Sequence, residues 1–335
     1  MQSSGFNINF CFSFNGLSAD VFNENKLYLR LLNSLRLIMG LELFFRNLKY
    51  LFKYNLKGMY NHANPIYEDE LILKILDAHK NLEELRDGVK LCNVMDAWST
   101  LDYLISTNAS FCRFGDGELS IAIEKQGNVF QRYDDLLSKK LMEVLSSKDN
   151  GLLVGINYYW FNAPNNLHDR QMLFYLTSSI KYRQMLKGIL SDDRVYGDST
   201  ITMPYVLYKD IDFRCYYDKL ESLWKGKDIV IVCGKTIFNN IKHNIFSSAN
   251  SIEYIYGPSV NAFDQYDDLM QKILATDKNK VKFIIMGQTA TVLAYDLYKN
   301  GHRAIDMGHT AKDYNYYLEK LAVDTNSITK FFDKD

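Results

Sequence analysis

The distribution of apolar residues predicts an alternation of short strands and helices along most of the chain. Apolar runs of strand length occupy 109–114, 151–156, 228–233, 252–256, 281–286 and 303–307. Helical spacing of apolar positions is found at 117–125, 133–147, 168–190, 212–224, 237–246, 262–276, 289–300 and 311–323. Short buried strands separated by helices are typical of a parallel sheet covered on both faces. The predicted fold class is therefore α/β, with a mostly parallel sheet.

The first part of the chain follows a different pattern. Helices are predicted at 69–86 and 90–106, and residues 26–57 place seven Lys or Arg side chains and one acid, Glu42, between apolar residues at helical spacing. This composition fits a basic amphipathic helix on an anionic membrane surface. It also fits a helix packed on the protein with its basic face in water. We predict a helical region at 1–107, a domain at 108–325 and a tail at 326–335.

Composition and charge exclude some classes of function. The 335 residues contain 39 Lys and Arg against 40 Asp and Glu, a net charge of −1. A dedicated nucleic-acid-binding protein would show a basic excess. The 5 cysteines are scattered without zinc-ligand spacing, and the first residues lack the pattern of a signal peptide. We expect a cytoplasmic protein that residues 26–57 could hold on the inner face of the cell membrane.

The segment Arg113-Phe114-Gly115-Asp116-Gly117-Glu118 follows the first predicted strand directly. Glycines on both sides of Asp116 allow a tight turn and close approach of the backbone to a ligand. The carboxylates of Asp116 and Glu118 are suitable ligands for Mg²⁺ or Mn²⁺ under a diphosphate, and Arg113 could pair with phosphate or hold one of the acids. The alternative is a turn before a helix whose first turn carries acids because they favour the helix dipole.

Three other strand ends carry candidate ligand contacts. Gly287-Gln288-Thr289 follows a predicted strand and begins a helix, where backbone N–H groups favour anions, so it could contact a phosphate or a ribose. The alternative is a plain helix cap by Thr289. His309, just past the last strand, could bind diphosphate or metal, or act as a base. Lys235 could reach a phosphate, although its Gly-Lys-Thr context lacks the earlier glycine of a Walker loop.

Four ordered blocks resemble the GT-D class of bacterial glycosyltransferases. They are the RFGDGE block described above and the segments GPSVNAFDQYD at 257–267, MGQTATVLAYDL at 286–297 and AIDMGH at 304–309. The corresponding segments of the family have the forms P-x-x-NAF-x-x-YD, GPTATVLAYDL and A-x-D-x-GH. The segment at 199–205 is similar to one in which Arg often precedes the proline, and Met203 stands there in this chain.

The resemblance implies a Rossmann-like domain that transfers a hexose, typically glucose from UDP-glucose, to a glycan acceptor. Asp116 and Glu118 would bind the metal, and Arg113, Gly115, Gly117, Lys235, Gly287, Gln288, Thr289 and His309 would contact the nucleotide sugar. Tyr205 is the expected acceptor contact. Asp313, where the family tends to have Glu, is the first candidate for the general base and His309 the second. We expect synthesis of a bacterial surface polysaccharide or glycoprotein glycan, on an acceptor that could be lipid-linked.

Two other functions remain open from the sequence. The same carboxylate pair could serve a metal-dependent nucleotide-sugar phosphohydrolase, which would release products without extending a glycan. A non-catalytic member could bind a nucleotide sugar, or act as a membrane scaffold through residues 26–57. The altered residues Lys235 and Met203 keep the second alternative open.

Overall fold

The computed structural model describes residues 92–323 apart from 163 and 192, together with Leu48, Phe52, Phe331 and Phe332. The chain divides into two compact units, Met1–Leu73 and Lys74–Asp335. The fold described below belongs to the second unit. The basic segment 26–57 lies outside the described residues except at the two isolated positions, so its amphipathic character stays a prediction. Over the described part of the chain, no helix is both long and apolar enough to span a membrane.

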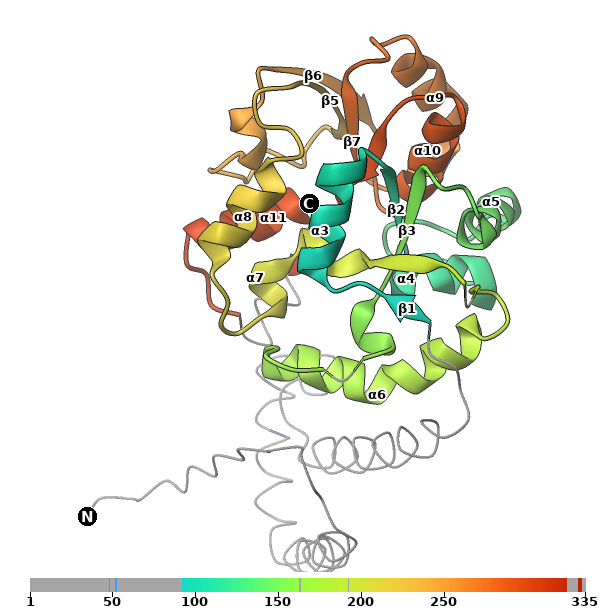
Figure 1. Ribbon diagram of the computed structural model, residues 1–335, viewed down its shortest axis with the longest axis vertical. Coiled ribbons are helices and arrows are strands. Elements are labelled where there is room, and N and C mark those ends of the chain that lie inside the picture. The colour runs from blue at the N-terminus through green and yellow to red at the C-terminus, as the bar shows by residue number, and fades with distance from the viewer. Residues whose placement is uncertain are drawn as a thin grey trace, which may run out of the picture. The chain divides into compact units, whose positions relative to one another are not determined.

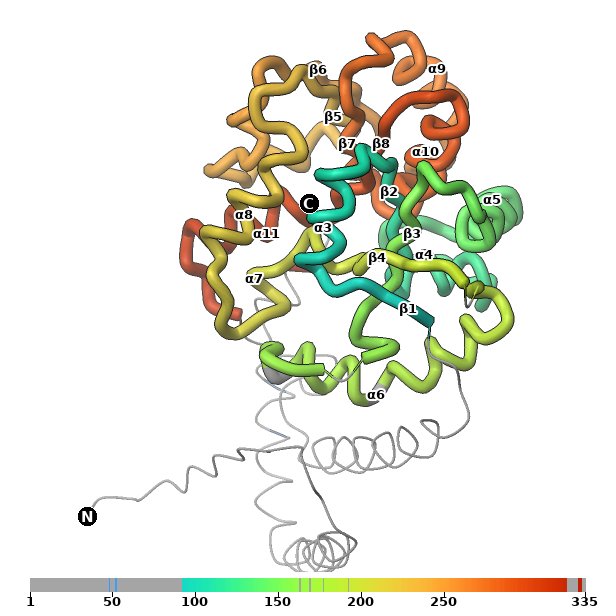
Figure 2. The backbone as a smooth tube through the Cα atoms, viewed as in Figure 1, coloured from blue at the N-terminus to red at the C-terminus, as the bar shows by residue number. Residues whose placement is uncertain are grey.

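A single sheet organises the described residues (Figure 1). Its strand order is β1-β4-β3-β2-β8-β7-β5-β6, and all neighbouring strands run parallel. Figure 2 shows β8 between β7 and β2, and β1 beside β4. The strands are β1 (Asn93–Val94), β2 (Ser110–Arg113), β3 (Leu152–Ile156), β4 (Val195–Asp198), β5 (Asp228–Gly234), β6 (Ser251–Gly257), β7 (Val281–Ile285) and β8 (Ala304–Asp306). The predicted α/β fold with a parallel sheet is confirmed.

The central strands bury both of their faces, to which successive side chains point in turn, whereas the edge strand β6 is largely exposed or half-buried. In β5, Ile229 and Ile231 belong to one apolar cluster, and Val230 and Val232 belong to the other. The first cluster also contains side chains of α3, α8 and α11, while the second contains side chains of α5, α9 and α10. The sheet therefore lies between two helical layers, as the unbroken apolar runs of the sequence predict.

The helices connect successive strands and carry few irregularities. A π-helix (η1, Ser120–Glu124) directly continues α4, and such wide turns are frequent at functional sites. The α-helices are α3 (Ala97–Thr107), α4 (Asp116–Leu119), α5 (Asp135–Ser146), α6 (Asp169–Leu186), α7 (Pro204–Leu207), α8 (Phe213–Glu221), α9 (Tyr266–Leu274), α10 (Gln288–Lys299) and α11 (Thr310–Leu318).

Basic side chains bind the carbonyl groups at the ends of several helices. Arg303 Nη2 donates to the carbonyl of Leu104 in α3 at 2.7 Å, and Lys227 Nζ donates to that of Leu223, just beyond α8, at 3.0 Å. Cations are favourable at helix C-termini, where backbone carbonyls lack helical partners. These helix ends lie at the amino edge of the sheet, so the positive ends of the helix dipoles lie toward the opposite, carboxyl edge.

The structure differs from the predicted elements at three places. The predicted helix 90–106 is replaced by β1 and a helix beginning at Ala97, because the Asp96 side chain accepts from Ser99 N at 2.7 Å and starts the helix there. The predicted helix 237–246 is a series of turns followed by a short 3₁₀ turn. Its asparagines favour such turns: Asn244 accepts from Phe246 N at 3.0 Å. Strand β4 was missed because its sequence, Val-Tyr-Gly-Asp, is not a continuous apolar run.

The folded unit also extends past the predicted limits 108 and 325. Strand β1 and helix α3 precede residue 108, yet β1 pairs with β4 and α3 contributes Leu101 and Leu104 to the core. Phe331, in the predicted tail 326–335, is completely buried. The two-residue strand and the single buried ring leave no periodic pattern in the sequence, and the helix predicted at 90–106 was assigned to the region before the domain.

Candidate active site at the carboxyl edge of the sheet

The loops after β2, β7 and β8 leave the middle of the sheet at its carboxyl edge. After β2 the chain builds β3 and β4 on one side, whereas β5 and β6 stand on the other side. Open parallel sheets bind ligands outside the carboxyl ends of the strands, where the strand order reverses direction. The predicted residues that follow β2, β7 and β8 therefore meet in the region where a ligand is expected.

A buried ion pair joins the ends of the two central strands. Arg113, the last residue of β2, donates through Nε and Nη2 to Asp306 Oδ1, the last residue of β8, at 3.2 Å each. Its Nη1 donates to the carbonyl of Ser199 at 2.7 Å and to Thr202 Oγ1 at 3.0 Å. Arg113 thus holds β2, β8 and the loop after β4 together. Its acidic partner is Asp306, and not Asp116 or Glu118, the acids that the sequence analysis considered.

Asp306 has no assigned role from the sequence, although it lies in the AIDMGH block. Besides Arg113, it accepts from Gly308 N at 3.0 Å and from Thr291 Oγ1 at 3.2 Å. It is 2% exposed, and burial raises its pKa despite the neighbouring guanidinium. The sequence offered one indication of a role for Asp306. It is the last residue of a buried strand, and such residues lie at the edge of the sheet where ligands bind.

Asp116 and Glu118 lie in the single turn of α4, immediately after β2. Gly115 precedes the turn, and its backbone N–H donates to Glu118 Oε2 at 2.7 Å. This contact folds the glutamate back over the start of the helix, as in a capping box. Asp116 is exposed, whereas Glu118 is partly buried. The structure therefore places both predicted metal ligands in one turn. It also shows the Glu118–Gly115 contact that is expected if the two acids only stabilise the start of a helix.

The carboxyl group of Glu118 lacks sufficient positive charge around it. Burial, and next the nearby carboxylate of Asp306, raise its pKa to about 7, although Arg113 and the Gly115 N–H act in the opposite direction. The positive charge of Arg113 is paired with the carboxylate of Asp306, so it compensates the charge of Glu118 less. A carboxyl group of this kind gains from a cation placed beside it.

The start of α10 lies next to the turn of α4. A side-chain Cβ added at Gly117 would come within 2.5 Å of Gln288 Nε2, so these two residues are in direct contact. Gly287 precedes the helix with a φ of +53°, a conformation that favours glycine. Because the first N–H groups of an α-helix have no helical partner, this helix start is suited to bind an anion.

Thr289 and the NAF segment are tied together by Gln131, which the sequence did not single out. Gln131 Oε1 accepts from Thr289 Oγ1 and from Phe263 N, at 3.3 Å in both cases. Next to it, the Asn261 N–H donates to the carbonyl of Phe130 at 2.8 Å. Thr289 is fully buried, so its side chain joins α10 to the loop that carries Gln131. Gln131 lies in a loop without periodic spacing, and no pattern in the sequence marks it.

Residues 111–331 match the family described as Glycosyltransferase GT-D fold. The matched segment contains β2, α4, α10 and β8, the elements that build the site. The chain belongs to the GT-D glycosyltransferase family. The resemblance stated from the four sequence blocks is confirmed.

Two streptococcal proteins are similar to this GT-D chain. The probable glycosyl transferase Gly of Streptococcus gordonii is 31% identical over 234 residues, which cover 67% of this chain and 33% of that protein. Glycosyltransferase GlyD of Streptococcus pneumoniae serotype 4 is 29% identical over 260 residues, covering 76% and 32%. The chain thus spans about a third of the length of these relatives.

Solved structures of the domain of unknown function 1792 share the GT-D fold. One, described as a distinct glycosyltransferase fold, is 28% identical with a TM-score of 0.66, over 76% of this chain and 87% of that chain. Another, described as a new glycosyltransferase from Streptococcus sanguinis, is 30% identical with a TM-score of 0.65, over 70% and 87%. The fold of the GT-D domain is therefore that of known glycosyltransferases.

His309 lies at the same edge of the GT-D domain, under aromatic side chains. Its ring centroid is 5.3 Å from that of Phe331 and 5.2 Å from that of Phe332. Burial, followed by the charges of Arg113 and Lys312, lowers its pKa to about 3. The imidazole is thus neutral at physiological pH, and an imidazole with this pKa is a weak general base.

Asp313, the first candidate for the base, is a buried structural residue in the GT-D domain. Its carboxylate accepts from Tyr205 N at 3.0 Å, Val206 N at 3.1 Å and Tyr217 Oη at 2.6 Å. It is completely buried, and burial raises its pKa to about 7. The two backbone contacts cap the first turn of α7, so the geometry does not favour Asp313 as the base.

Tyr205, the predicted acceptor contact, belongs to the same structural cluster. Its hydroxyl donates to the carbonyl of Leu321 at 3.0 Å, and its ring packs against those of Phe213 and Tyr317. The ring is partly exposed. No contact in the described residues links Tyr205 to Asp116 or Glu118, and its role toward an acceptor stays a prediction.

We expect Asp313→Ala to destabilise the domain without lowering the activity of the folded fraction. The variant leaves three buried donors without an acceptor, which should cost about 2 kcal/mol or more. Urea denaturation followed by circular dichroism measures this loss. Asp218→Ala, an exposed position on α8, is the control and should change stability little. Normal stability together with lost turnover would restore Asp313 as the base.

Lys235 stands farther along the carboxyl edge of the GT-D domain. It is exposed and directly follows β5, which is separated from β8 by β7. The neighbouring Gly234 packs against Ser259, where an added Cβ would come within 2.4 Å of Ser259 Oγ. The side chain can reach toward a ligand from this position, but the structure does not bring it into contact with α4.

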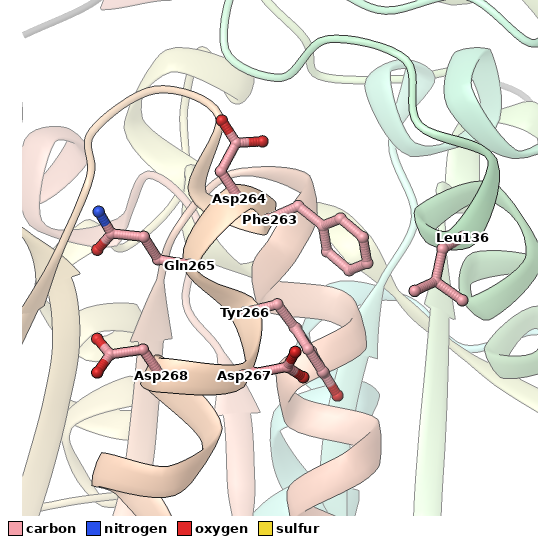
Figure 3. Close-up of a pocket in the computed structure, with 7 residues that line it drawn as sticks. All are labelled: Leu136, Phe263, Asp264, Gln265, Tyr266, Asp267 and Asp268. Carbon is pink, nitrogen blue, oxygen red and sulfur yellow. The ribbon is translucent and has the colours of Figure 1, made fainter.

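A hollow of about 580 Å³ lies away from the predicted residues, where Leu136 of α5 faces the start of α9 (Figure 3). Its lining is Leu136, Phe263, Asp264, Gln265, Tyr266, Asp267 and Asp268. The three carboxylates of this lining would repel a diphosphate. Two of them lie in the first turn of α9, where the helix dipole stabilises negative charge. This hollow is therefore not a suitable nucleotide site.

Proposed function

We propose that this chain is a metal-dependent hexosyltransferase that uses a nucleotide sugar, UDP-glucose in the first place, and a glycan acceptor. The observation that carries the proposal is the turn of α4, which presents Asp116 and Glu118 directly after a central strand. Membership of the GT-D family supports the transfer reaction. The streptococcal relatives, both named as glycosyltransferases, support the same reaction class. The acceptor that we propose belongs to bacterial surface polysaccharide or glycoprotein glycan synthesis.

The residues present fit a Mn²⁺ or Mg²⁺ ion held by Asp116 and Glu118. Among the described residues, no three His, Cys, Asp or Glu side chains gather as a metal site, so the protein would supply two carboxylates. Diphosphate and water oxygens suit the remaining positions of such hard cations. The raised pKa of Glu118 supports the fit, because a cation would offset both its burial and the charge of Asp306. When bound, the metal would neutralise charge on the leaving diphosphate.

The protein residues around this turn would bind and orient the donor. The backbone N–H groups at the start of α10 would bind diphosphate oxygens, and Gly287 allows the backbone to approach them. The Arg113–Asp306 pair fixes the two strand ends on which the turn depends. Lys235, which is exposed, would contribute a further positive charge toward the phosphates.

Product analysis tests the proposed reaction. The protein is incubated with UDP-glucose and Mn²⁺, with and without candidate glycan acceptors, and the products are followed by NMR. A transferase yields UDP and an extended glycan, with slow release of glucose when no acceptor is present. Release of UMP and glucose 1-phosphate would instead identify a phosphohydrolase. Binding of UDP-glucose without any turnover would indicate a non-catalytic member.

Binding of Mn²⁺ together with UDP-glucose is expected to weaken below pH 7. The metal binds the ionised carboxylate, whereas Glu118, with a pKa of about 7 in the metal-free protein, holds a proton at lower pH. Affinity should therefore fall by up to about tenfold per pH unit below 7. Calorimetry at pH 6, 7 and 8 measures this dependence. Glu118→Gln should bind weakly at every pH; a wild-type affinity that does not change with pH contradicts the metal assignment.

A further inference from the structure

The carboxamide of Gln288 occupies an unusual position at the first residue of α10. The side chain is 8% exposed, and its Oε1 is buried without a hydrogen-bond partner. On the other side, Nε2 lies 2.5 Å from the position of a Cβ on Gly117, between Asp116 and Glu118. Buried polar atoms in folded proteins nearly always have partners, because an unsatisfied one is costly. The missing partner of Gln288 therefore points to a ligand.

The polar side chains next to Gln288 find their partners inside the protein. Asn128 Oδ1 accepts from Phe130 N at 2.9 Å and from Gln131 N at 3.1 Å. Thr289 Oγ1 donates to Gln131 Oε1. The loop and the helix start are thus fixed without help from Gln288, whose amide is left directed at the turn of α4. This turn carries the proposed metal ligands.

We infer that the Gln288 carboxamide binds a hydroxyl group of the sugar-nucleotide donor and makes this residue a determinant of donor specificity. A carboxamide presents an acceptor and a donor side by side. A hydroxyl can satisfy both, whereas a phosphate oxygen only accepts. The backbone of α10 is suited to the diphosphate, and hydroxyls flank a diphosphate on either side, on the ribose and on the hexose. The inference rests on the proposed function.

Gln288 is a feature of this chain and is not part of the GT-D sequence pattern that the chain resembles. The similar segment GPTATVLAYDL has proline where Gln288 stands. Proline is well tolerated at the first position of a helix, since the N–H that it lacks has no helical partner there. It cannot, however, present an amide to a ligand. Gln288 is thus a polar group added at a position where helix formation does not require one.

Calorimetry of Gln288→Leu with UDP and with UDP-glucose, both in Mn²⁺, tests the inference. The variant should bind about 3- to 10-fold more weakly, as expected for one lost hydrogen bond. Weaker binding of both ligands assigns the hydroxyl to the ribose, and weaker binding of UDP-glucose alone assigns it to the hexose. Unchanged affinity for both ligands overturns the inference. Gln271→Leu, the same change at an exposed position of α9, should bind both ligands normally.

The melting temperature of the ligand-free variant provides a second measurement. Removing an unsatisfied buried acceptor should leave the melting temperature of Gln288→Leu unchanged or raise it by about 2–4 °C. A clear decrease would show that Gln288 serves the fold and would overturn the inference. If the wild-type protein binds neither ligand, the proposed function fails and the inference fails with it. If the wild type binds and Gln288→Leu binds equally well, only the inference fails.

Discussion

Asp116→Asn and Glu118→Gln are each expected to lower glucosyl transfer by at least about 100-fold, because each removes one of the two carboxylates that would hold the metal. Both substitutions keep the size of the side chain, and in Glu118→Gln the new carboxamide oxygen can still accept from Gly115 N, so α4 should form normally. UDP release from UDP-glucose in the presence of Mn²⁺ is the measurement. Retention of more than half of the wild-type turnover in either variant would contradict the metal assignment.

Stability measurements separate this effect from unfolding. Glu118 has a pKa of about 7 in the fold, above its usual 4.5. The folded protein therefore holds a proton that the unfolded chain has lost between these values, and metal-free stability falls as pH rises through this window. Glu118→Gln should remove the loss of stability that ionisation of Glu118 causes. In EDTA at pH 8, the melting temperature of this variant should therefore be no lower than that of the wild type. Asp268→Asn, an exposed acid in the first turn of α9, is the activity control.

Gly308→Ala is expected to cause the largest loss of stability among the single substitutions considered. A Cβ at this position would stand 1.9 Å from Arg113 Nη2, and the φ of +42° is itself unfavourable for alanine. The guanidinium would have to leave Asp306, and disrupting a buried ion pair costs about 3–5 kcal/mol. Urea denaturation measures the loss, and transfer activity should fall with it because the ends of β2 and β8 separate.

The chain offers a matched control for this substitution. Gly226 also has a positive φ, +69°, but an added Cβ there would meet nothing within 4 Å. Gly226→Ala therefore carries the backbone strain without the collision, and should cost only about 1 kcal/mol. Equal losses in the two alanine variants would show that the Arg113–Asp306 pair adjusts without cost.

The sequence predicted the sheet well because most of its strands are buried on both faces. All six apolar runs became strands. The two strands that were not predicted, β1 (Asn-Val) and β4 (Val-Tyr-Gly-Asp), contain polar residues and no apolar run. They are recognised only through their partners, since β1 and β4 pair with each other and β4 pairs with β3. Local spacing carries no information about such pairing.

The site was predicted less completely, because side-chain roles depend on distant partners. Asp116 and Glu118 were visible as a local motif beside glycines. Asp313 was predicted as the general base because nothing in the sequence shows that its side chain caps a helix more than a hundred residues earlier in the chain, at Tyr205. Gln131 is a similar case, since its partner Thr289 is 158 positions away.

The Arg113–Asp306 pair has a consequence for biosynthesis. The two residues are 193 positions apart in sequence, and β8 is the last strand of the described sheet to be synthesised. Until it emerges, the growing chain has β2 and the turn of α4 but no Asp306 to hold Arg113, and the place of β8 between β2 and β7 stays empty. Contacts of such long range form late and slowly. A nascent chain that ends before β8 therefore lacks the Arg113–Asp306 pair that joins the ends of β2 and β8.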